Sequence, residues 1–426
     1  MPEPYDVITM GRIGVDIYPL QTGVPLARVE TFGKFLGGSP SNVAVAAARL
    51  GRRTAVVTRT GRDAFGDYLH QALGEFGVDD RWVSAVAEYP TPVTFCEIFP
   101  PDHFPLYFYR QPKAPDLEIH GEELDLDAVR DARVFWMTGT GLCAEPSLSA
   151  TLTALRARSE AAASGVAGGP PRVTVFDLDW RPMFWEGGDH SSAAPARYRE
   201  ALAHATVAVG NLDECEIATG EREPRAAARA LLAAGVELAV VKQGPAGVLA
   251  AHRDGTTAEI PPLPVDVVNG LGAGDAFGGA LCHGLLAGWD TERVMRYANA
   301  AGAIVASRLA CSSAMPFPHE VERALSEGVV GEADGEAGGE LPGGTAGPPG
   351  TTGPRATGTP AATATAADGT PGVGGTPGGA GGSAGGTGTP GGAGGSAGGT
   401  GTPGVGGTPA SGPNSRATTR TPGAAP

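Results

Sequence analysis

Short apolar runs alternate with longer amphipathic stretches along the first 330 residues of the chain. The apolar runs have the length and composition of strands buried on both faces of a sheet, and they lie at 5–11, 54–58, 134–138, 173–179, 205–210 and 237–244. Stretches with helical periodicity separate or follow them, at 42–50, 63–76, 147–163, 195–204, 224–234 and 272–287. This alternation predicts an α/β fold with a doubly wound, mostly parallel sheet flanked by helices. In such sheets, ligands bind beyond the carboxyl ends of the strands.

Two segments break this rhythm, at about 12–36 and 91–112. Both contain short, aromatic, proline-bounded β pieces with no helical stretch of their own. They predict a small second sheet that acts as a β lid or as a dimer contact. The alternative is that they decorate an edge of the main sheet.

The composition changes abruptly after about residue 330. Residues 331–426 consist mostly of Gly, Thr, Pro, Ala and Ser, and the block at 378–390 repeats unchanged at 391–403. A segment so poor in large apolar side chains cannot offset its chain entropy by burial, so we expect a disordered low-complexity tail. It has no aromatic residue and few charges, which favours a flexible linker over a scaffold. Residues 1–330 are long enough to form one large domain.

Charge and cysteine usage narrow the class of protein further. The net charge of −15 argues against nucleic acid or an anionic membrane as a partner, although a few arginines can still bind an anionic substrate. The five cysteines form no CxxC pair, which is typical of reduced thiols in a cytoplasmic protein. No apolar run reaches the roughly 18 residues that a membrane helix needs, and the N-terminus lacks the apolar core of a signal peptide.

The most unusual local stretch is "NGLGAGDAFG" at 269–278, which follows a strand-like run and opens a helical one. Small residues at a helix start let backbone N–H groups approach an anion, and the helix dipole favours negative charge there. Asp275 is then either a general base beside a phosphate or simply a cap of the helix. The stretch is neither a Walker loop nor a GxGxxG motif, since Phe277 occupies the last glycine position.

A second glycine-rich stretch, "GGSPSNVAVAAARLGRRTAVVTRTG" at 37–61, presents Asn42 from a turn that opens an Ala-rich helix. Its amide offers both a donor and an acceptor, which suits a sugar hydroxyl. Together the two stretches resemble both signature patterns of the ribokinase-like, PfkB-type carbohydrate kinases. The first pattern is matched throughout 37–61 and the second over 272–275. The resemblance covers about residues 1–325.

The resemblance implies an ATP-dependent, Mg²⁺-assisted kinase and a role for each matching position. The expected catalytic groups are the base and the backbone N–H groups of the anion hole, at Asp275, Gly272, Ala273 and Gly274. The expected sugar-binding residues are Asp16, Gly38 and Asn42. The expected nucleotide-binding residues are Lys242, Gly244 and Asn299. The residues expected to organise Mg²⁺ through water are Asn211 and Glu214. Without this resemblance, Asp16 and Glu214 would be interpreted as solvated loop carboxylates.

One position departs from the family pattern. Family members commonly carry Asp and then a hydroxyl residue ahead of the glycines, whereas this chain has Asn269-Gly270-Leu271. The expected hydroxyl contact to phosphate is therefore missing, and the family's monovalent-cation site is left open. The base and the anion hole remain complete.

The sequence also indicates the substrate class. Arg110, with Lys113 nearby, and Arg181 match positions at which similar kinases of keto-deoxy sugar acids bind the substrate carboxylate. The alternative for Arg181 is a structural ion pair with Asp177 or Asp179.

The forms "DLDWRPMFW" at 177–185 and "GAIVASRLACSSAMP" at 302–316 look most like those of family members that phosphorylate 5-dehydro-2-deoxygluconate. This resemblance implies transfer of phosphate to the terminal hydroxyl of that acid, giving the 6-phosphate in myo-inositol catabolism. A kinase of 2-dehydro-3-deoxygluconate or a fructokinase-like enzyme is the alternative, and a non-catalytic sugar-acid sensor is an alternative of another class. A homodimer that pairs through the lid is also expected from the resemblance.

Overall fold

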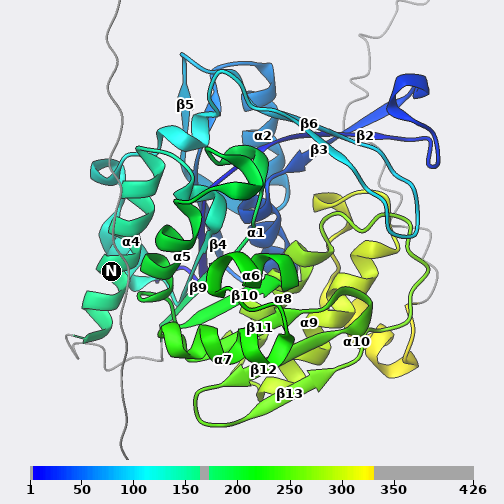
Figure 1. Ribbon diagram of the computed structural model, residues 1–426. Coiled ribbons are helices and arrows are strands. Elements are labelled where there is room, and N and C mark those ends of the chain that lie inside the picture. The colour runs from blue at the N-terminus through cyan, green and yellow to red at the C-terminus, as the bar shows by residue number, and fades with distance from the viewer. Residues whose placement is uncertain (1–2, 164–171, 331–426) are drawn as a thin grey trace, which may run out of the picture. The chain divides into compact units, whose positions relative to one another are not determined.

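The computed structural model describes residues 3–163 and 172–330 (Figure 1), so the predicted disordered tail lies outside the described residues. In the described part, the main sheet has nine strands in the order β13-β12-β11-β10-β9-β8-β1-β4-β5. Their bounds are β1 Val7–Met10, β4 Thr54–Gly61, β5 Val78–Val86, β8 Val134–Thr138, β9 Val173–Asp177, β10 Val207–Asn211, β11 Leu238–Lys242, β12 Val248–His252 and β13 Thr257–Ile260.

The seven neighbouring strands from β11 to β5 in this order are all parallel to one another. Strands β12 and β13 continue the sheet beyond β11 as an antiparallel edge. The six predicted strands are therefore confirmed, and with them the doubly wound, mostly parallel fold. The other three strands of the main sheet, β5, β12 and β13, have sequence patterns that are less typical of buried strands. The sequence of β5, "VDDRWVSAV", is charged because it lies at an edge, and β12, "VLAAH", is rich in alanine, which has a low strand propensity.

Helices cover both faces of the sheet. One face carries α3 Leu126–Asp131, α4 Ser147–Ala163, α5 Ala194–Leu202, α6 Leu212–Thr219 and α7 Pro224–Ala234. The other carries α1 Ser39–Arg49, α2 Ala64–Glu75, α8 Ala273–Leu286, α9 Thr291–Ala306 and α10 Pro318–Glu327. The side chains of β8 alternate between these two cores: Phe135 and Met137 pack into the first, Val134 and Trp136 into the second.

A second, four-stranded sheet has the order β3-β2-β6-β7, and we call it the lid sheet. Its strands are β2 Gly14–Pro19, β3 Phe32–Gly37, β6 Val93–Cys96 and β7 Leu106–Tyr109. They come from the two segments that broke the sequence rhythm, and none of them pairs with a strand of the main sheet. Figure 1 shows β2, β3 and β6 reaching beyond the helices that flank the main sheet.

None of the helices within 3–163 and 172–330 is long and apolar enough to cross a membrane. All five cysteines lie in these ranges, where they are buried and form no disulfide.

Candidate active site

The parallel strands of the main sheet end at one pocket of about 280 Å³. Arg12 follows β1, while Asp177, Asn211 and Lys242 are the last residues of β9, β10 and β11. The strand order reverses at β1, so the connections after β1 and β8 run to opposite faces of the sheet and leave a crevice between them. Among the residues predicted from sequence, the pocket is lined by Asp16, Gly38, Asn42, Arg181, Asn211, Glu214, Lys242, Gly272, Gly274 and Asp275.

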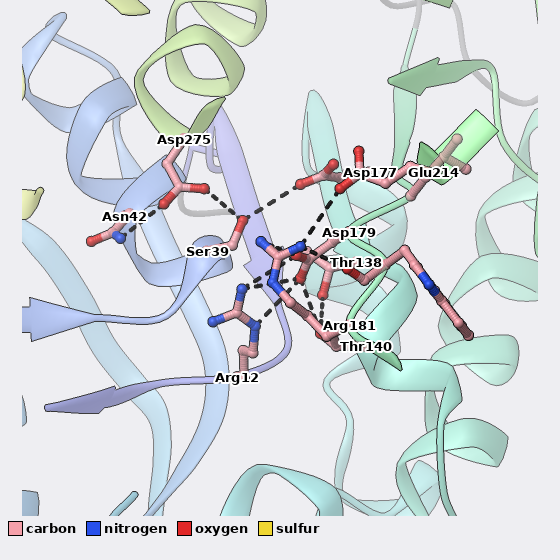
Figure 2. Close-up of polar contacts among 12 residues, drawn as sticks. Arg12, Ser39, Asn42, Thr138, Thr140, Asp177, Asp179, Arg181, Glu214 and Asp275 are labelled. Atoms are coloured by element: carbon pink, nitrogen blue, oxygen red, sulfur yellow. Dashed lines mark hydrogen bonds and ion pairs between the residues drawn. The ribbon is translucent and has the colours of Figure 1, made fainter. Parts of the chain in front are cut away.

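Asp275 lies in the first turn of α8 and points back toward α1 (Figure 2). Its Oδ1 accepts a hydrogen bond of 2.7 Å from Ser39 Oγ, and its Oδ2 accepts one of 2.9 Å from Asn42 Nδ2. The N-cap position of the helix is Gly272, not Asp275. The carboxylate is therefore held by side chains across the pocket rather than by its own helix.

Two glycines of α8 permit this geometry. Gly272 has a left-handed φ of 83°, and a Cβ there would lie 2.7 Å from Cys311 Sγ. Gly279 faces α1 so closely that a Cβ would collide with Ala46. Because α8 packs directly against α1, Asp275 comes within hydrogen-bonding reach of the α1 side chains.

Burial governs the electrostatics around Asp16 and Asp275. It raises the pKa of Asp275 above its ordinary value, against the opposing effect of the Ser39 and Asn42 hydrogen bonds. It also raises the pKa of Asp16 to about 7, although Tyr18 donates a 3.0 Å hydrogen bond to that carboxylate. Asp16 is buried and Asp275 is half-buried, so the interpretation of Asp16 as a solvated loop carboxylate is wrong.

Asp177 and Asp179 are also buried in the pocket, but their pKa values shift in opposite directions. Burial raises the pKa of Asp177 to about 8, and its nearest hydroxyl, Ser39 Oγ, lies 3.5 Å away. Burial would also raise the pKa of Asp179, but the charges of Arg12 and Arg181 outweigh it and hold that pKa below its ordinary value. Asp179 also has a φ of 32°, the only positive φ at a non-glycine residue in the described part of the chain.

Asn211 and Glu214 form the capping box of α6, with each side chain accepting a hydrogen bond from the backbone N–H of the other. Glu214 is buried, which corrects its interpretation as a solvated loop carboxylate, and its Oε1 lies 3.7 Å from Arg181 Nη1. Burial would lower the pKa of Lys242, but carboxylates led by Glu214 and Asp177 raise it, so the ammonium stays charged.

The structure does not bring Arg110 to the pocket lining. Its guanidinium donates to the buried carboxylate of Asp116, with a shortest distance of 2.7 Å, and lies 4.7 Å from the centre of the Phe184 ring. Lys113 pairs with Glu118. Arg181 lines the pocket and also forms the ion pair that was its alternative, at 3.0 Å from Asp179.

Two predicted nucleotide residues adjoin Gln243 and Pro261, which line a second hollow of about 300 Å³, but do not line that hollow themselves. Gly244 is exposed in the turn after β11, next to Gln243. Asn299, on α9, donates a 3.1 Å hydrogen bond to the carbonyl of Pro261. Ala273 is the first residue of α8, between Gly272 and Gly274.

Residues 5–318 match the family described as pfkB family carbohydrate kinase. The chain belongs to this family.

This kinase is 32% identical over 326 residues to a protein named 5-dehydro-2-deoxygluconokinase from Shouchella clausii (strain KSM-K16), an alignment that covers 76% of this chain and 96% of that protein. Among solved structures, it is similar to a putative ribokinase II in complex with ATP and Mg²⁺ from E. coli, with a TM-score of 0.67 and 23% identity, covering 76% and 99%. A fructokinase with bound ATP from Xylella fastidiosa has a TM-score of 0.64 and 26% identity, covering 76% and 99%.

The kinase pocket contains side chains that the sequence interpretation had not assigned. The main ones are Arg12, Tyr18, Ser39 and Cys311. Ser39 lies inside the glycine-rich stretch 37–61, a signal that points to the pocket without indicating a role, whereas Arg12 lies in neither glycine-rich stretch. Tyr18 and Cys311, whose hydroxyl and thiol lie 2.8 Å apart, are 293 positions apart in the chain, so only the fold brings them together.

Proposed function

We propose that the protein is an ATP-dependent kinase of a keto-deoxy sugar acid, with 5-dehydro-2-deoxygluconate as substrate and its 6-phosphate as product, acting in myo-inositol catabolism. The observation that carries this proposal is the half-buried Asp275, held by Ser39 and Asn42 at the start of α8, in a pocket that also presents two arginines. The name and 32% identity of the Shouchella clausii protein support the choice of acid.

In the proposed reaction, the terminal hydroxyl of the acid gives its proton to Asp275 while its oxygen attacks the γ-phosphorus of ATP. The bond between that phosphorus and the bridging oxygen breaks, and ADP leaves with the bond electrons. The backbone N–H groups of Gly272, Ala273 and Gly274 at the α8 N-terminus are placed to stabilise the charge on the phosphoryl oxygens. Asp16, Gly38 and Asn42 bind the sugar hydroxyls from the opposite wall.

The nucleotide is proposed to extend from Lys242 toward the second hollow, beside Gly244 and Asn299. No group of three or more His, Cys, Asp or Glu within the described ranges is arranged to hold a metal ion. The amide and carboxylate oxygens of Asn211 and Glu214 fit Mg²⁺, which keeps several waters and binds through one or two carboxylates together with substrate phosphates. Asn211 and Glu214 would hold it through its water, and the ion would supply charge neutralisation on the phosphates.

The lid sheet is proposed both to close over the substrate and to form a homodimer contact. Thr94, Leu106 and Phe108 line the pocket, whereas the alternating residues Tyr107 and Tyr109 are exposed. A sheet with one face on the substrate and one aromatic face in solvent can be covered by the same face of a second copy.

An ATP-coupled substrate panel tests the proposal, with 5-dehydro-2-deoxygluconate, 2-dehydro-3-deoxygluconate, fructose and adenosine. We expect the highest kcat/KM for 5-dehydro-2-deoxygluconate. A higher value for 2-dehydro-3-deoxygluconate or fructose would replace the substrate assignment. If calorimetry shows that an acid binds tightly but no ADP is formed, the protein would instead be the non-catalytic sensor.

A further inference from the structure

Two guanidinium groups share one carboxylate at the base of the pocket. Arg12 donates to both oxygens of Asp179 over 3.3 Å, and Arg181 Nη2 lies 3.0 Å from Asp179 Oδ1. Figure 2 shows both guanidinium groups directed at this carboxylate from different segments of the chain. Arg181 is also 3.7 Å from Glu214, while the carboxylate bonded to Arg12 in the described part is Asp179 alone. Arg12 is therefore paired with a carboxylate that a second arginine already engages.

Both arginines keep donors for a further anion. The hydrogen bonds of Arg12 use Nε and Nη2, and none to a described residue comes from Nη1. Arg181 Nε is buried and has no hydrogen-bond partner among the described residues. A guanidinium offers five N–H donors in a planar fork that matches a carboxylate. An unpaired buried donor is costly, so a second carboxylate between the two arginines would be bound favourably.

The cations of the pocket have different close neighbours. The charge of Lys242 interacts with Glu214, Asp177 and Asp275 and, least of the four, with Asp179, and its Nζ lies 3.5 Å from where a Cβ of Gly274 would stand. This places Lys242 beside the anion hole. Arg12 instead bonds directly to Asp179, and its charge also acts on Asp16, on the proposed sugar-binding wall, and on Asp275.

We propose that Arg12, oriented by Asp179 and assisted by Arg181, binds the carboxylate of the substrate and selects for an acid over a neutral sugar. This inference rests on the proposed function, because it names the group that recognises the acid. It assigns to Arg12 the contact that the sequence resemblance gave to Arg110, which is held by Asp116 away from the pocket lining.

Asp179 is a positioning residue in this arrangement. Its left-handed φ of 32° turns its carboxylate toward Arg12, where it also accepts a 3.2 Å hydrogen bond from Thr140. Arg12 itself lies between β1 of the main sheet and β2 of the lid sheet. A carboxylate bound by Arg12 therefore contacts the connection from which the lid sheet extends.

The test compares Arg12→Met and Arg12→Lys with the wild type, using 5-dehydro-2-deoxygluconate and its C1 carboxamide as substrates. For Arg12→Met we expect the ratio of kcat/KM for acid over carboxamide to fall at least tenfold, with KM for ATP unchanged. Arg12→Lys keeps the charge without the fork and should lose part of that selectivity. The matched control is Arg59→Met, since Arg59 also pairs with one carboxylate, that of Glu123, but lies outside the pocket.

Thermal unfolding of each variant separates loss of binding from loss of fold, and Arg12→Lys keeps the test valid if Arg12→Met does not fold. An unchanged acid-to-carboxamide ratio in a folded Arg12 variant overturns the inference. So does a rise in KM for ATP alone, or a loss of acid selectivity in Arg110→Met but not in Arg12→Met. A wild-type enzyme inactive on every acid would instead remove the proposed function itself.

Discussion

At the scale of single residues, the carboxylate of Asp275 accepts one hydrogen bond on each oxygen, from Ser39 and from Asn42. This arrangement fixes the orientation of the proposed base without neutralising it. We expect Asp275→Asn to lower kcat by about 10²–10⁴, the usual contribution of a general base, while KM for the acid changes little. Steady-state kinetics would measure this, and a near-normal kcat would remove the assignment. Ser39→Ala, which removes one orienting bond, should lower kcat by only several-fold.

Asp16 predicts a pH dependence of both activity and stability. Its pKa of about 7 exceeds the ordinary 3.8, so kcat/KM should fall as the pH drops below about 7 and the carboxylate becomes protonated. Because its pKa is raised, the Asp16 carboxyl of the folded protein keeps its proton up to about pH 7, whereas the unfolded chain releases that proton near pH 3.8. Its contribution to stability is therefore complete below pH 3.8 and is lost as the pH rises toward 7.

Asp16→Asn is therefore expected to raise Tm at pH 8 while lowering kcat/KM. One kcal/mol would correspond to roughly 2 °C in a domain of this size. Calorimetry of the variant at pH 5 and pH 8 measures the difference, and an equal Tm change at both values would show that Asp16 is ionised in the folded protein throughout this range.

How much of the site could be predicted depends on how each residue is recognised. Asp275 and Asn42 stand in local glycine-rich patterns, so their place in the pocket could be inferred from sequence. Arg12 could not be linked to Asp179, because the two residues are 167 positions apart and only the fold of the sheet brings them together. The difference between Arg110 and Arg181 could not be predicted either, since both are arginines near strand ends and a separation of six residues does not by itself indicate that Arg110 pairs with Asp116.

At the scale of elements, the alternation of apolar and helical stretches predicted the parallel strands other than β5 and most of the longer helices. The helix predicted at 147–163 has the same bounds in the structure, whereas α1 begins at Ser39 instead of 42 because Pro40 fits the first turn of a helix. The 16-residue α9 was not predicted, although its apolar residues recur with helical spacing and its small residues "ANAAGA" are mostly buried in the core that α8 also forms. Its helical pattern was therefore present in the sequence and was missed.

The turn that leads into α8 depends on Asn269, the residue at which the chain departs from the family pattern. Its Nδ2 donates a 2.7 Å hydrogen bond to the carbonyl of Leu309, and its Oδ1 accepts one of 3.1 Å from the N–H of Leu271. The buried amide thus joins the glycine-rich turn to the segment that carries Cys311.

Asn269→Ala should leave the Leu309 carbonyl and the Leu271 N–H without these partners, at a cost of about 1–3 kcal/mol for each group that stays buried. We expect a lower Tm together with a lower kcat, because the same turn positions the N–H groups of the anion hole. Ser313→Ala, an exposed position nearby, is the control for general effects of substitution. A drop in Tm with an unchanged kcat would show that the turn is stabilising but not needed for positioning.

At the scale of the whole molecule, the fold follows from a repeated strand-and-helix pattern, but the site arises where segments from across the chain meet. The pocket draws residues from the β1–β2 connection, from α1, from the ends of β9, β10 and β11, and from α8. These segments span positions 12 to 275, so the site is a property of the complete sheet and cannot be assigned to one motif.

Because the pocket residues all come from the first part of the chain, we predict that the C-terminal segment contributes nothing to catalysis. The whole pocket is formed within the unit Met1–Gly344, and the segment from 345 onward contains no aromatic residue and little charge that could recognise a sugar acid or nucleotide. Removing residues 345–426 should therefore leave kcat/KM within twofold and Tm within about 1 °C of the full-length values. Kinetics and calorimetry on both proteins, prepared in parallel, provide the measurement. A loss of kcat/KM of tenfold or more at an unchanged Tm would mean that the segment contacts the substrate, the nucleotide or the lid sheet.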